Sequence, residues 1–279
     1  GMDWDEGPDV GGPYGPYTQS ERLDIYKEKA EELIEKGYAY RCNCSPERLE
    51  RVREAQRALG KPPMYDRHCR NRPPGEVSSD EPHVIRLKVP EEGETIVTDL
   101  LRGEVAFENK LIDDQVLLKS DGFPTYHLAV VVDDHLMKIS HVLRGDDWLP
   151  SAPKHFLLYE AFGWKPPVFV HVPLVMGEDG KKLSKRHGAV SVEDFRKQGY
   201  VPEAVFNFLA LLGWAPGEGD EQEIFSREEL IERFELSRVK LSSAVFSYDK
   251  LDWMNGVYIR NMSEEELLKR LIPFWQDAG

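Results

Sequence analysis

The sequence predicts an α/β fold in which a parallel sheet is followed by a helical region. Two observations predict it. Between residues 23 and 175, hydrophobic patterns of helical and strand type alternate, which is typical of parallel strands joined by helical crossovers. After Ser191 the pattern is helical.

The first elements are predicted by periodicity and capping signals. Apolar residues recur on one face of a helix that begins near Leu23 and stops at Gly37, a residue suited to a helix C-terminus. Ser45 and Pro46 supply an N-cap and a first-turn proline for a second helix, which ends near Gly60.

Strands are expected next. Residues 83–89 alternate apolar and charged side chains, which predicts a half-buried strand with Arg86 and Lys88 on its open face. Shorter strands are expected at residues 95–99 and 116–118.

The centre of the chain is more apolar. Residues 128–132 form an apolar run that fits either a strand or a helix buried on both sides, and residues 139–143 form another short apolar segment. Ser151 is expected to cap a helix that reaches Gly163, and residues 168–175 follow as a buried strand. Such sheets bind ligands beyond the carboxyl ends of their strands.

Capping signals also organise the remaining helical region. Ser191 with Asp194 forms a variant of the capping box, and Ser226 with Glu229 forms a full one. A helix is expected from residue 202 to about residue 212.

Composition limits the class of protein. The 279 residues allow two or three domains, and a net charge of −14 argues against a protein that coats nucleic acid non-specifically. Residues 38–75 nevertheless carry nine Arg or Lys against four acids, which fits either a phosphate-binding patch or a solvated helix face. Three cysteines, no long apolar run and no leader favour a cytoplasmic or organelle-matrix protein that does not enter a membrane.

Two polar segments come directly after predicted strands, where a ligand site is expected. Lys182, Ser184 and Lys185 follow a glycine turn and fit either a mobile clamp on a polyphosphate or a basic surface turn. Arg144 begins the segment 144–148 and fits either a two-bond fork to a carboxylate or a surface salt bridge.

Together these segments resemble glutamyl-tRNA synthetases of bacterial or organellar type, within the class I aminoacyl-tRNA synthetases. The resemblance covers almost the whole chain, and the order of its motifs makes it specific. It is carried by residues 3–8, 15–22, 120–129, 132–137, 141–148, 182–186 and 252–256.

The resemblance implies three domains. An incomplete Rossmann-like catalytic domain would comprise residues 1–20 and 124–190. An inserted α+β domain that binds the tRNA acceptor end would comprise residues 21–123, and a helical stem-contact domain residues 191–279.

The implied activity is ATP-dependent ligation of glutamate to tRNA through a glutamyl-adenylate, with Mg²⁺. Its partners would be L-glutamate, ATP and a glutamate-accepting tRNA, and the protein would be a monomer. Lys185 is expected to clamp the β- and γ-phosphates, with Lys182 and Ser184 as its catalytic companions, and Asp147 and Trp148 would flank the nucleotide.

The resemblance also implies how glutamate is recognised. Arg144 would bind the side-chain carboxylate and Tyr126 would add a hydroxyl. Val130 stands where the family often has an asparagine that contacts the amino acid, and its side chain cannot hydrogen-bond.

Some members of the family carry zinc in the inserted domain. Cys42, Cys44 and Cys69 match that arrangement, and zinc takes four ligands. Tyr65 matches a tyrosine ligand of a close sub-branch and is the expected fourth ligand, with His68 adjacent to the set; Asn71 stands where other relatives have histidine. Three thiols without metal remain the alternative.

The family's HIGH-type motif normally precedes the segment at residues 3–8, and its anticodon-binding domain normally follows residue 279. The chain is therefore expected to be an internal fragment that is inactive alone. A glutamyl-queuosine tRNA synthetase and a non-catalytic tRNA-binding fragment are the alternatives to a glutamate–tRNA ligase.

Overall fold

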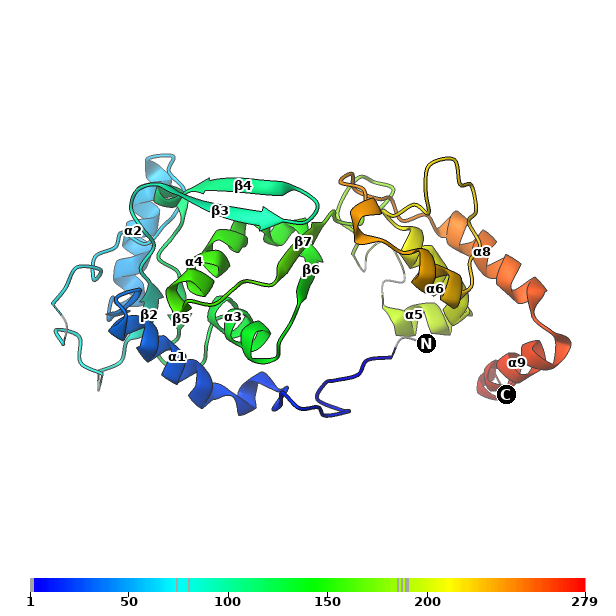
Figure 1. Cartoon of the computed structure of the whole chain (residues 1–279), viewed down its shortest axis with the longest axis horizontal. Coiled ribbons are helices and arrows are strands. Elements are labelled where there is room, and N and C mark those ends of the chain that lie inside the picture. Colours follow the sequence, from blue (N-terminus) through cyan, green and yellow to red (C-terminus); the bar gives the residue numbers. More distant parts are fainter. Residues whose placement is uncertain are drawn as a thin grey trace. The chain divides into compact units, whose positions relative to one another are not determined.

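The computed structural model describes residues 3–73, 75–79, 81–184, 186, 188 and 191–278. The chain divides into two compact units (Figure 1). The sheet unit contains residues 3–144 and 148–170, and the helical unit contains residues 145–147 and the chain from residue 171 onward.

An antiparallel sheet of three strands forms one part of the sheet unit. Its strand order is β1–β2–β5, and Ala39 pairs with Leu87 while Ile85 pairs with Leu118. The helix α1 packs against β1 and β5 and ends before Gly37, whose φ of +80° suits glycine. The elements are α1 (Leu23–Glu35), β1 (Ala39–Cys42), β2 (Val84–Leu87) and β5 (Val116–Leu118).

The strand β2 is buried on both faces, so the prediction that it is half-buried was wrong. Arg86 is only 5% exposed, because its guanidinium donates to the carbonyl oxygen of Asp114 at 3.0 Å and lies 3.9 Å from the ring centre of Tyr65. Alternation places Arg86 opposite Ile85 and Leu87 but does not reveal what covers its face.

A second sheet has the strand order β4–β3–β7–β6. It is mixed rather than wholly parallel: β3 pairs parallel with β7, whereas β3 and β4 form an antiparallel hairpin because only three residues join them. The strands are β3 (Glu94–Asp99), β4 (Gly103–Glu108), β6 (His141–Gly145) and β7 (Val168–Val172). Strands β3 and β4 lie within residues 21–123, so this sheet joins that segment to β7.

Two helices complete the core of the sheet unit. The run at residues 128–132 lies in α3 (Tyr126–Leu136), so the open choice resolves to a helix. Helix α4 (Ala152–Phe162) packs against β3 and against α3, and it ends at Gly163 with φ of +75°. The expected cap at Ser151 was wrong, because this residue ends a preceding 3₁₀ helix and its backbone is already helical, with φ of −91° and ψ of −16°. Together with α1, these helices enclose one large cluster of buried apolar side chains.

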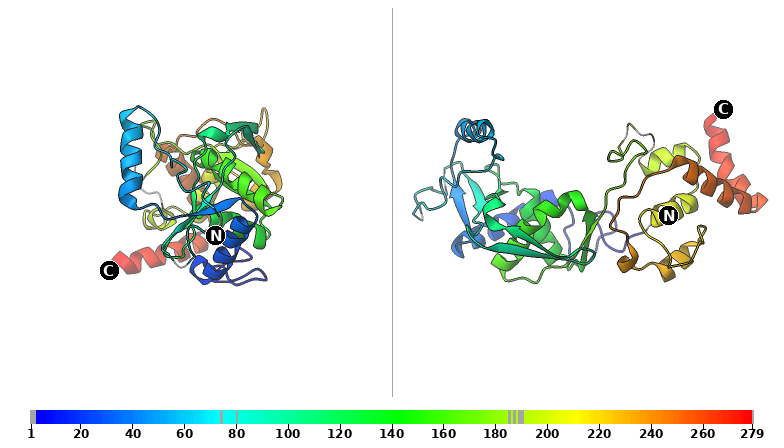
Figure 2. Two further views of the ribbon diagram at one scale, coloured as in Figure 1. Left: turned by 90° about the vertical axis from the view of Figure 1, so that its left-hand side faces the viewer. Right: turned by 90° about the horizontal axis from the view of Figure 1, so that it is seen from above.

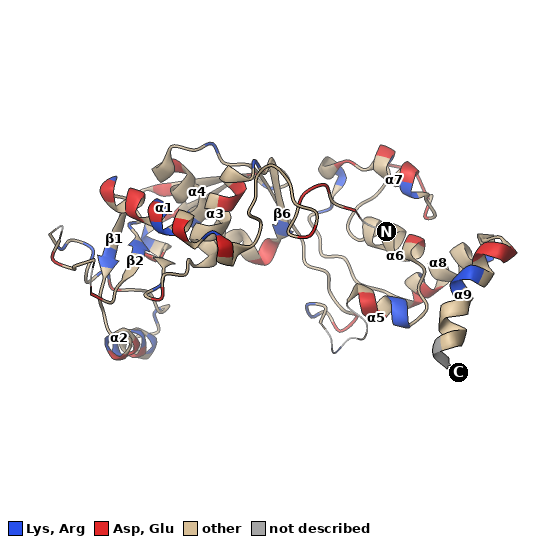
Figure 3. Ribbon diagram, turned by 90° about the horizontal axis from the view of Figure 1, so that it is seen from below, with Lys and Arg blue, Asp and Glu red and all other residues tan. Residues whose placement is uncertain are grey.

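Helix α2 (Pro46–Ala58) has a different character. The Ser45 hydroxyl accepts a hydrogen bond from the backbone N–H of Arg48, which confirms the expected cap. The helix has no buried residue, and Figure 2 shows it standing away from the rest of its unit. Arginine is prominent on it, as the blue segments in Figure 3 show.

Among the described residues, the helical unit contains five α-helices and two small apolar clusters of its own. Ser191 accepts from the N–H of Asp194, and Ser226 forms the full capping box with Glu229, as the sequence predicts. None of the helices in the described part of the chain is long and apolar enough to cross a membrane. The helices are α5 (Val192–Lys197), α6 (Pro202–Leu211), α7 (Arg227–Arg233), α8 (Tyr248–Asn261) and α9 (Glu264–Ala278).

Candidate functional site

Arg144 lies near the end of β6, among aromatic rings of the sheet unit. Its guanidinium carbon is 5.2 Å from the ring centre of Phe169 and 6.0 Å from that of Trp148. Its Nη1 atom is 3.2 Å from Nδ1 of His155. The rings and the imidazole therefore hold a cation at the carboxyl end of a strand, where the sequence predicts a ligand site.

Tyr126 and Trp148 lie together beside this arginine. Their ring centres are 4.5 Å apart, and they are 41% and 38% exposed. Tyr126 is the first residue of α3, and Trp148 follows β6 by three residues. The structure thus brings together three residues predicted from sequence, and both rings retain enough open surface to contact a ligand.

Two histidines join the group and were missed by the sequence analysis. His127 Nδ1 is 3.0 Å from His155 Nε2, and His155 is only 1% exposed. Burial, helped by the charges of Lys154 and Arg144, lowers the pKa of His127 to about 4. The available signal was weak: His127 follows Tyr126 directly, and His155 interrupts the apolar face of a predicted helix.

Two aspartates at the end of α3 lie in contrasting environments. Asp133 accepts from Arg22 Nε at 2.8 Å and from the Tyr26 hydroxyl at 2.7 Å, which ties α1 to α3. Burial, and secondarily the charge of Asp133, raises the pKa of Asp134 to about 6. Val130, on the same helix, packs against the apolar core.

A second group of predicted residues lies in the helical unit. Lys182 Nζ is 2.7 Å from Asp147 Oδ2, and this hydrogen bond lowers the pKa of Asp147. The lysine sits on a tight hairpin in which Met176 pairs with Lys182 and Gly180 has φ of +72°. Ser184 is exposed at the end of this hairpin.

Lys185, the residue expected to clamp the phosphates, lies outside the described residues. Its neighbour Arg186 is 3.5 Å from Asp179, at the turn of the hairpin. The described part of this segment therefore presents cations on a polar, exposed turn.

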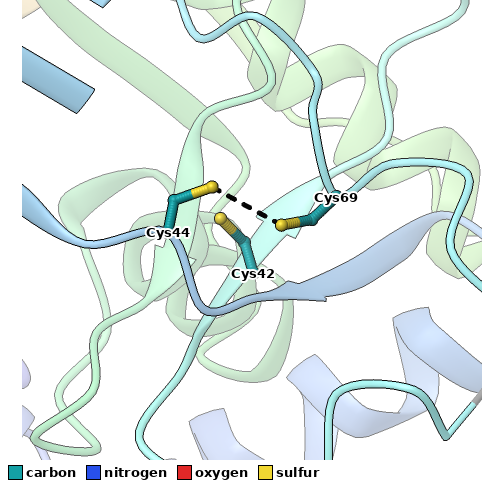
Figure 4. A group of neighbouring side chains, drawn as sticks. All are labelled: Cys42, Cys44 and Cys69. Carbon is teal, nitrogen blue, oxygen red and sulfur yellow. Dashed lines mark hydrogen bonds between the residues drawn. The ribbon is translucent and has the colours of Figure 1, made fainter. Parts of the chain in front are cut away.

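The three cysteines gather in the sheet unit (Figure 4). Their sulfur atoms all lie within 4.8 Å of one another, and Cys44 and Cys69 are 3.5 Å apart. Cys42 and Cys44 approach the Tyr65 hydroxyl at 3.3 and 3.5 Å. We call Cys42, Cys44, Cys69 and Tyr65 the thiol cluster.

The surroundings of the thiol cluster separate the candidates for a fourth ligand. The Tyr65 hydroxyl also accepts from the backbone N–H of Cys69 at 2.9 Å, so it points into the cluster. His68 is exposed, and its Nε2 lies 3.0 Å from Arg72 Nη2. Burial raises the pKa of Cys44 to about 11, which a bound cation would reverse by favouring the thiolate.

The sequence is similar to a known protein family and to curated proteins. Residues 1–253 match the family model described as the catalytic domain of class I tRNA synthetases (E and Q). Over 274 residues the chain is 57% identical to a glutamate–tRNA ligase of Dehalococcoides mccartyi, with 98% of this chain and 55% of that protein covered. A glutamate–tRNA ligase of Treponema pallidum is 55% identical, with 97% of this chain and 51% of that protein covered.

The fold is also similar to solved structures. A glutamate–tRNA synthetase from Elizabethkingia anophelis superposes with a TM-score of 0.88 at 39% identity, covering 100% of this chain and 62% of that one. The chain spans about half the length of the curated relatives it matches.

Proposed function

The chain belongs to the class I tRNA synthetases of the glutamate and glutamine group, and we propose that it forms the amino-acid- and ATP-binding part of a glutamate–tRNA ligase. The relatives reported above carry that name, which supports this reading over a glutamyl-queuosine synthetase or a non-catalytic tRNA-binding fragment. The reaction would join glutamate to the α-phosphate of ATP with release of pyrophosphate, and would then transfer the glutamyl group to a ribose hydroxyl of tRNA with release of AMP.

The single observation that carries the proposal is the environment of Arg144. Its guanidinium is held by His155 and lies against the rings of Trp148 and Phe169. A guanidinium offers donors only, in a planar fork that matches a carboxylate. Arg144 would therefore bind the side-chain carboxylate of glutamate, and the half-exposed Tyr126 would add a hydroxyl.

ATP would be bound by the residues after β6 and by the lysine hairpin. Class I synthetases use ATP with Mg²⁺ in general. Lys182 now donates to Asp147, so a phosphate would compete with that carboxylate for the ammonium. Lys185 and Ser184 would add a cation and a hydroxyl. Fixed cations of this kind stabilise the negative charge that develops on phosphate oxygens.

The tRNA acceptor end would lie along the basic helix α2. Its arginines are exposed or half-exposed, and the exposed Arg53 and Arg57 both pair with Glu50, at 3.3 and 3.0 Å. Exposed pairs of this kind are weak, so a nucleic-acid phosphate can replace the carboxylate. Residues 21–123 would then form the acceptor-binding domain, and residues 191–279 the stem-contact domain.

Zinc would be held by the thiol cluster. Three sulfur atoms within 4.8 Å of one another fit the soft ligands that zinc prefers, and the Tyr65 hydroxyl points into the same space. The metal would supply a structural crosslink between β1 and the segment that carries Tyr65 and Cys69.

Glutamate-dependent pyrophosphate exchange tests the function, measured with tRNA present in the complete protein that contains this chain. We expect Arg144→Ala to raise the glutamate KM by about 10- to 100-fold, the range for one lost charge-assisted hydrogen bond, and to leave the ATP KM unchanged. Arg260→Ala, an exposed arginine at the end of α8, is the matched control. If both KM values rise together in Arg144→Ala, the arginine is structural; an unchanged glutamate KM removes the proposal.

A further inference from the structure

The histidine pair beside Arg144 is the feature that the proposed chemistry does not use. His155 comes from the first turn of α4, His127 from the first turn of α3, and Arg144 from β6. Two short contacts, of 3.2 Å and 3.0 Å, link the three side chains in the order Arg144, His155, His127. Three elements thus converge on one arginine.

The donors and acceptors of these contacts follow from chemistry. A guanidinium can only donate, so Nδ1 of His155 must accept and carries no proton. The proton of a neutral His155 is then on Nε2, which donates to Nδ1 of His127. Nδ1 of His127 is therefore also an acceptor, and the proton of that ring is on Nε2. In this series of hydrogen bonds, each donor therefore points away from Arg144.

These two hydrogen bonds require both imidazole rings to be neutral. A protonated His155 would present an N–H to the guanidinium, and a protonated His127 would present one to His155. His155 is only 1% exposed, so water does not replace either contact. The nearby cations, Lys154 and Arg144, disfavour a charge on His127, and burial acts in the same direction.

From this geometry we propose that His155, supported by His127, is a positioning residue that fixes the orientation of Arg144 for binding the substrate carboxylate. Arginine has many rotamers, and a ligand that must immobilise it loses affinity. A buried acceptor on one side of the guanidinium restricts its rotamers before the ligand arrives. The inference rests on the proposed function, in which Arg144 reads glutamate.

Two substitutions at His155 separate positioning from packing. Leucine removes both ring nitrogens, whereas asparagine keeps an oxygen near the place of Nδ1 that can accept from Arg144. In the complete protein we expect His155→Leu to raise the glutamate KM about tenfold, as for one lost hydrogen bond to a charged group, with the ATP KM unchanged. His155→Asn should recover most of the loss. An asparagine variant no better than leucine, or equal rises in both KM values, overturns the proposal.

A double-mutant cycle shows whether His155 acts through Arg144. In an Arg144→Ala background, His155→Leu should have no further effect on the glutamate KM, because the group it positions is absent. Additive effects overturn the proposal. His141→Leu, an exposed histidine on β6, is the control and should leave the KM unchanged.

Ring-nitrogen NMR of the 279-residue chain tests the geometry without activity. At neutral pH both His155 and His127 should carry their proton on Nε2, with Nδ1 unprotonated. A proton on either Nδ1 overturns the proposal, even where His155→Leu fails to fold. If Arg144→Ala leaves the glutamate KM unchanged, the proposed function fails; if Arg144→Ala raises it and His155→Leu does not, only the positioning role fails.

Discussion

Lys182 illustrates how a residue of the proposed site is held without being buried. Its side chain is 60% exposed, and its partner Asp147 is 39% exposed. An exposed ion pair contributes little to folding because water screens it. The pair with Asp147 therefore holds the Lys182 ammonium while contributing little to folding stability. The ammonium can exchange this carboxylate for another anion.

The first prediction concerns Lys182 and the lysine that follows it in sequence at position 185. In the complete protein, Lys185→Ala should lower the rate of adenylate formation by about 10²-fold or more, as for removal of one donor to the transition state, and Lys182→Ala should lower it less. The thermal unfolding midpoint should not change, since the described residues of this segment, such as Lys182 and Ser184, are polar and exposed. Single-turnover assays measure the rate of adenylate formation, and calorimetry measures the unfolding midpoint. Lys181→Ala is the control, and an unchanged rate for Lys185→Ala would rule the clamp out.

The second prediction concerns His127 and pH. Its folded-state pKa, about 4, lies below the ordinary value of 6.5, so the unfolded chain binds the proton more readily between these values. The contribution of His127 to stability is therefore complete above about pH 6.5 and is lost as the pH falls towards 4. Asp134 acts in the opposite sense, because its raised pKa of about 6 favours the protonated folded form.

A comparison with His127→Asn isolates the histidine from Asp134. We expect the unfolding free energy of the original protein to fall relative to the variant over the interval from pH 6.5 to 4. Urea unfolding at several pH values measures this difference, and NMR titration of the ring measures the pKa. A ring that titrates near 6.5 in the folded protein would contradict the prediction.

At the scale of elements, the thiol cluster joins parts of the chain that lie apart in the sequence. β1 supplies Cys42, and the loop after α2 supplies Tyr65 and Cys69. The apolar cluster around them is small, with Tyr40, Leu49 and Val84 as further members. A metal crosslink would hold this end of the sheet together more firmly than that cluster alone.

The third prediction is that the purified chain contains about one equivalent of zinc, the stoichiometry of a single structural site. Cys44→Ser should lose the metal. Tyr65→Phe should weaken binding in a chelator competition, whereas His68→Ala, whose ring is exposed beside Arg72, should not. Metal analysis together with thiol labelling decides the matter. Less than about a tenth of an equivalent, with freely reactive thiols, would leave three unmetallated cysteines.

At the scale of the whole molecule, each unit has its own core. The large cluster around Leu158 and Tyr26 is confined to the sheet unit. The clusters around Leu251 and Trp214 are confined to the helical unit. Since unfolding is cooperative within a core, the two units should respond separately to a core substitution.

The fourth prediction follows from these separate cores. Leu251→Ala should destabilise the helical unit by about 2–5 kcal/mol, the usual cost of such a cavity, and Leu158→Ala should do the same for the sheet unit. Hydrogen exchange, followed amide by amide, should show lost protection only in the unit that carries the change. Equal loss in both units would mean that the chain unfolds as one body.

The sequence alone determined the local elements and the family. The caps at Ser45, Ser191 and Ser226 are where the pattern predicts them, because a cap depends on residues three positions apart. The family assignment rested on ordered motifs, and comparison with known proteins confirms it. The fourth ligand of the thiol cluster and the roles of Arg144 and Lys185 stay predictions, since sequence gives their residue types and not their chemistry.

Only the tertiary structure decided which side chains meet across the fold. It buried Arg86 against Tyr65, paired β3 with β7, and linked Arg144 to His155 and His155 to His127. Each of these contacts joins residues on different elements, so no periodicity of 2 or 3.6 residues carries the information. Periodicity reports which face of an element is apolar; what lies against the other face depends on how the chain packs.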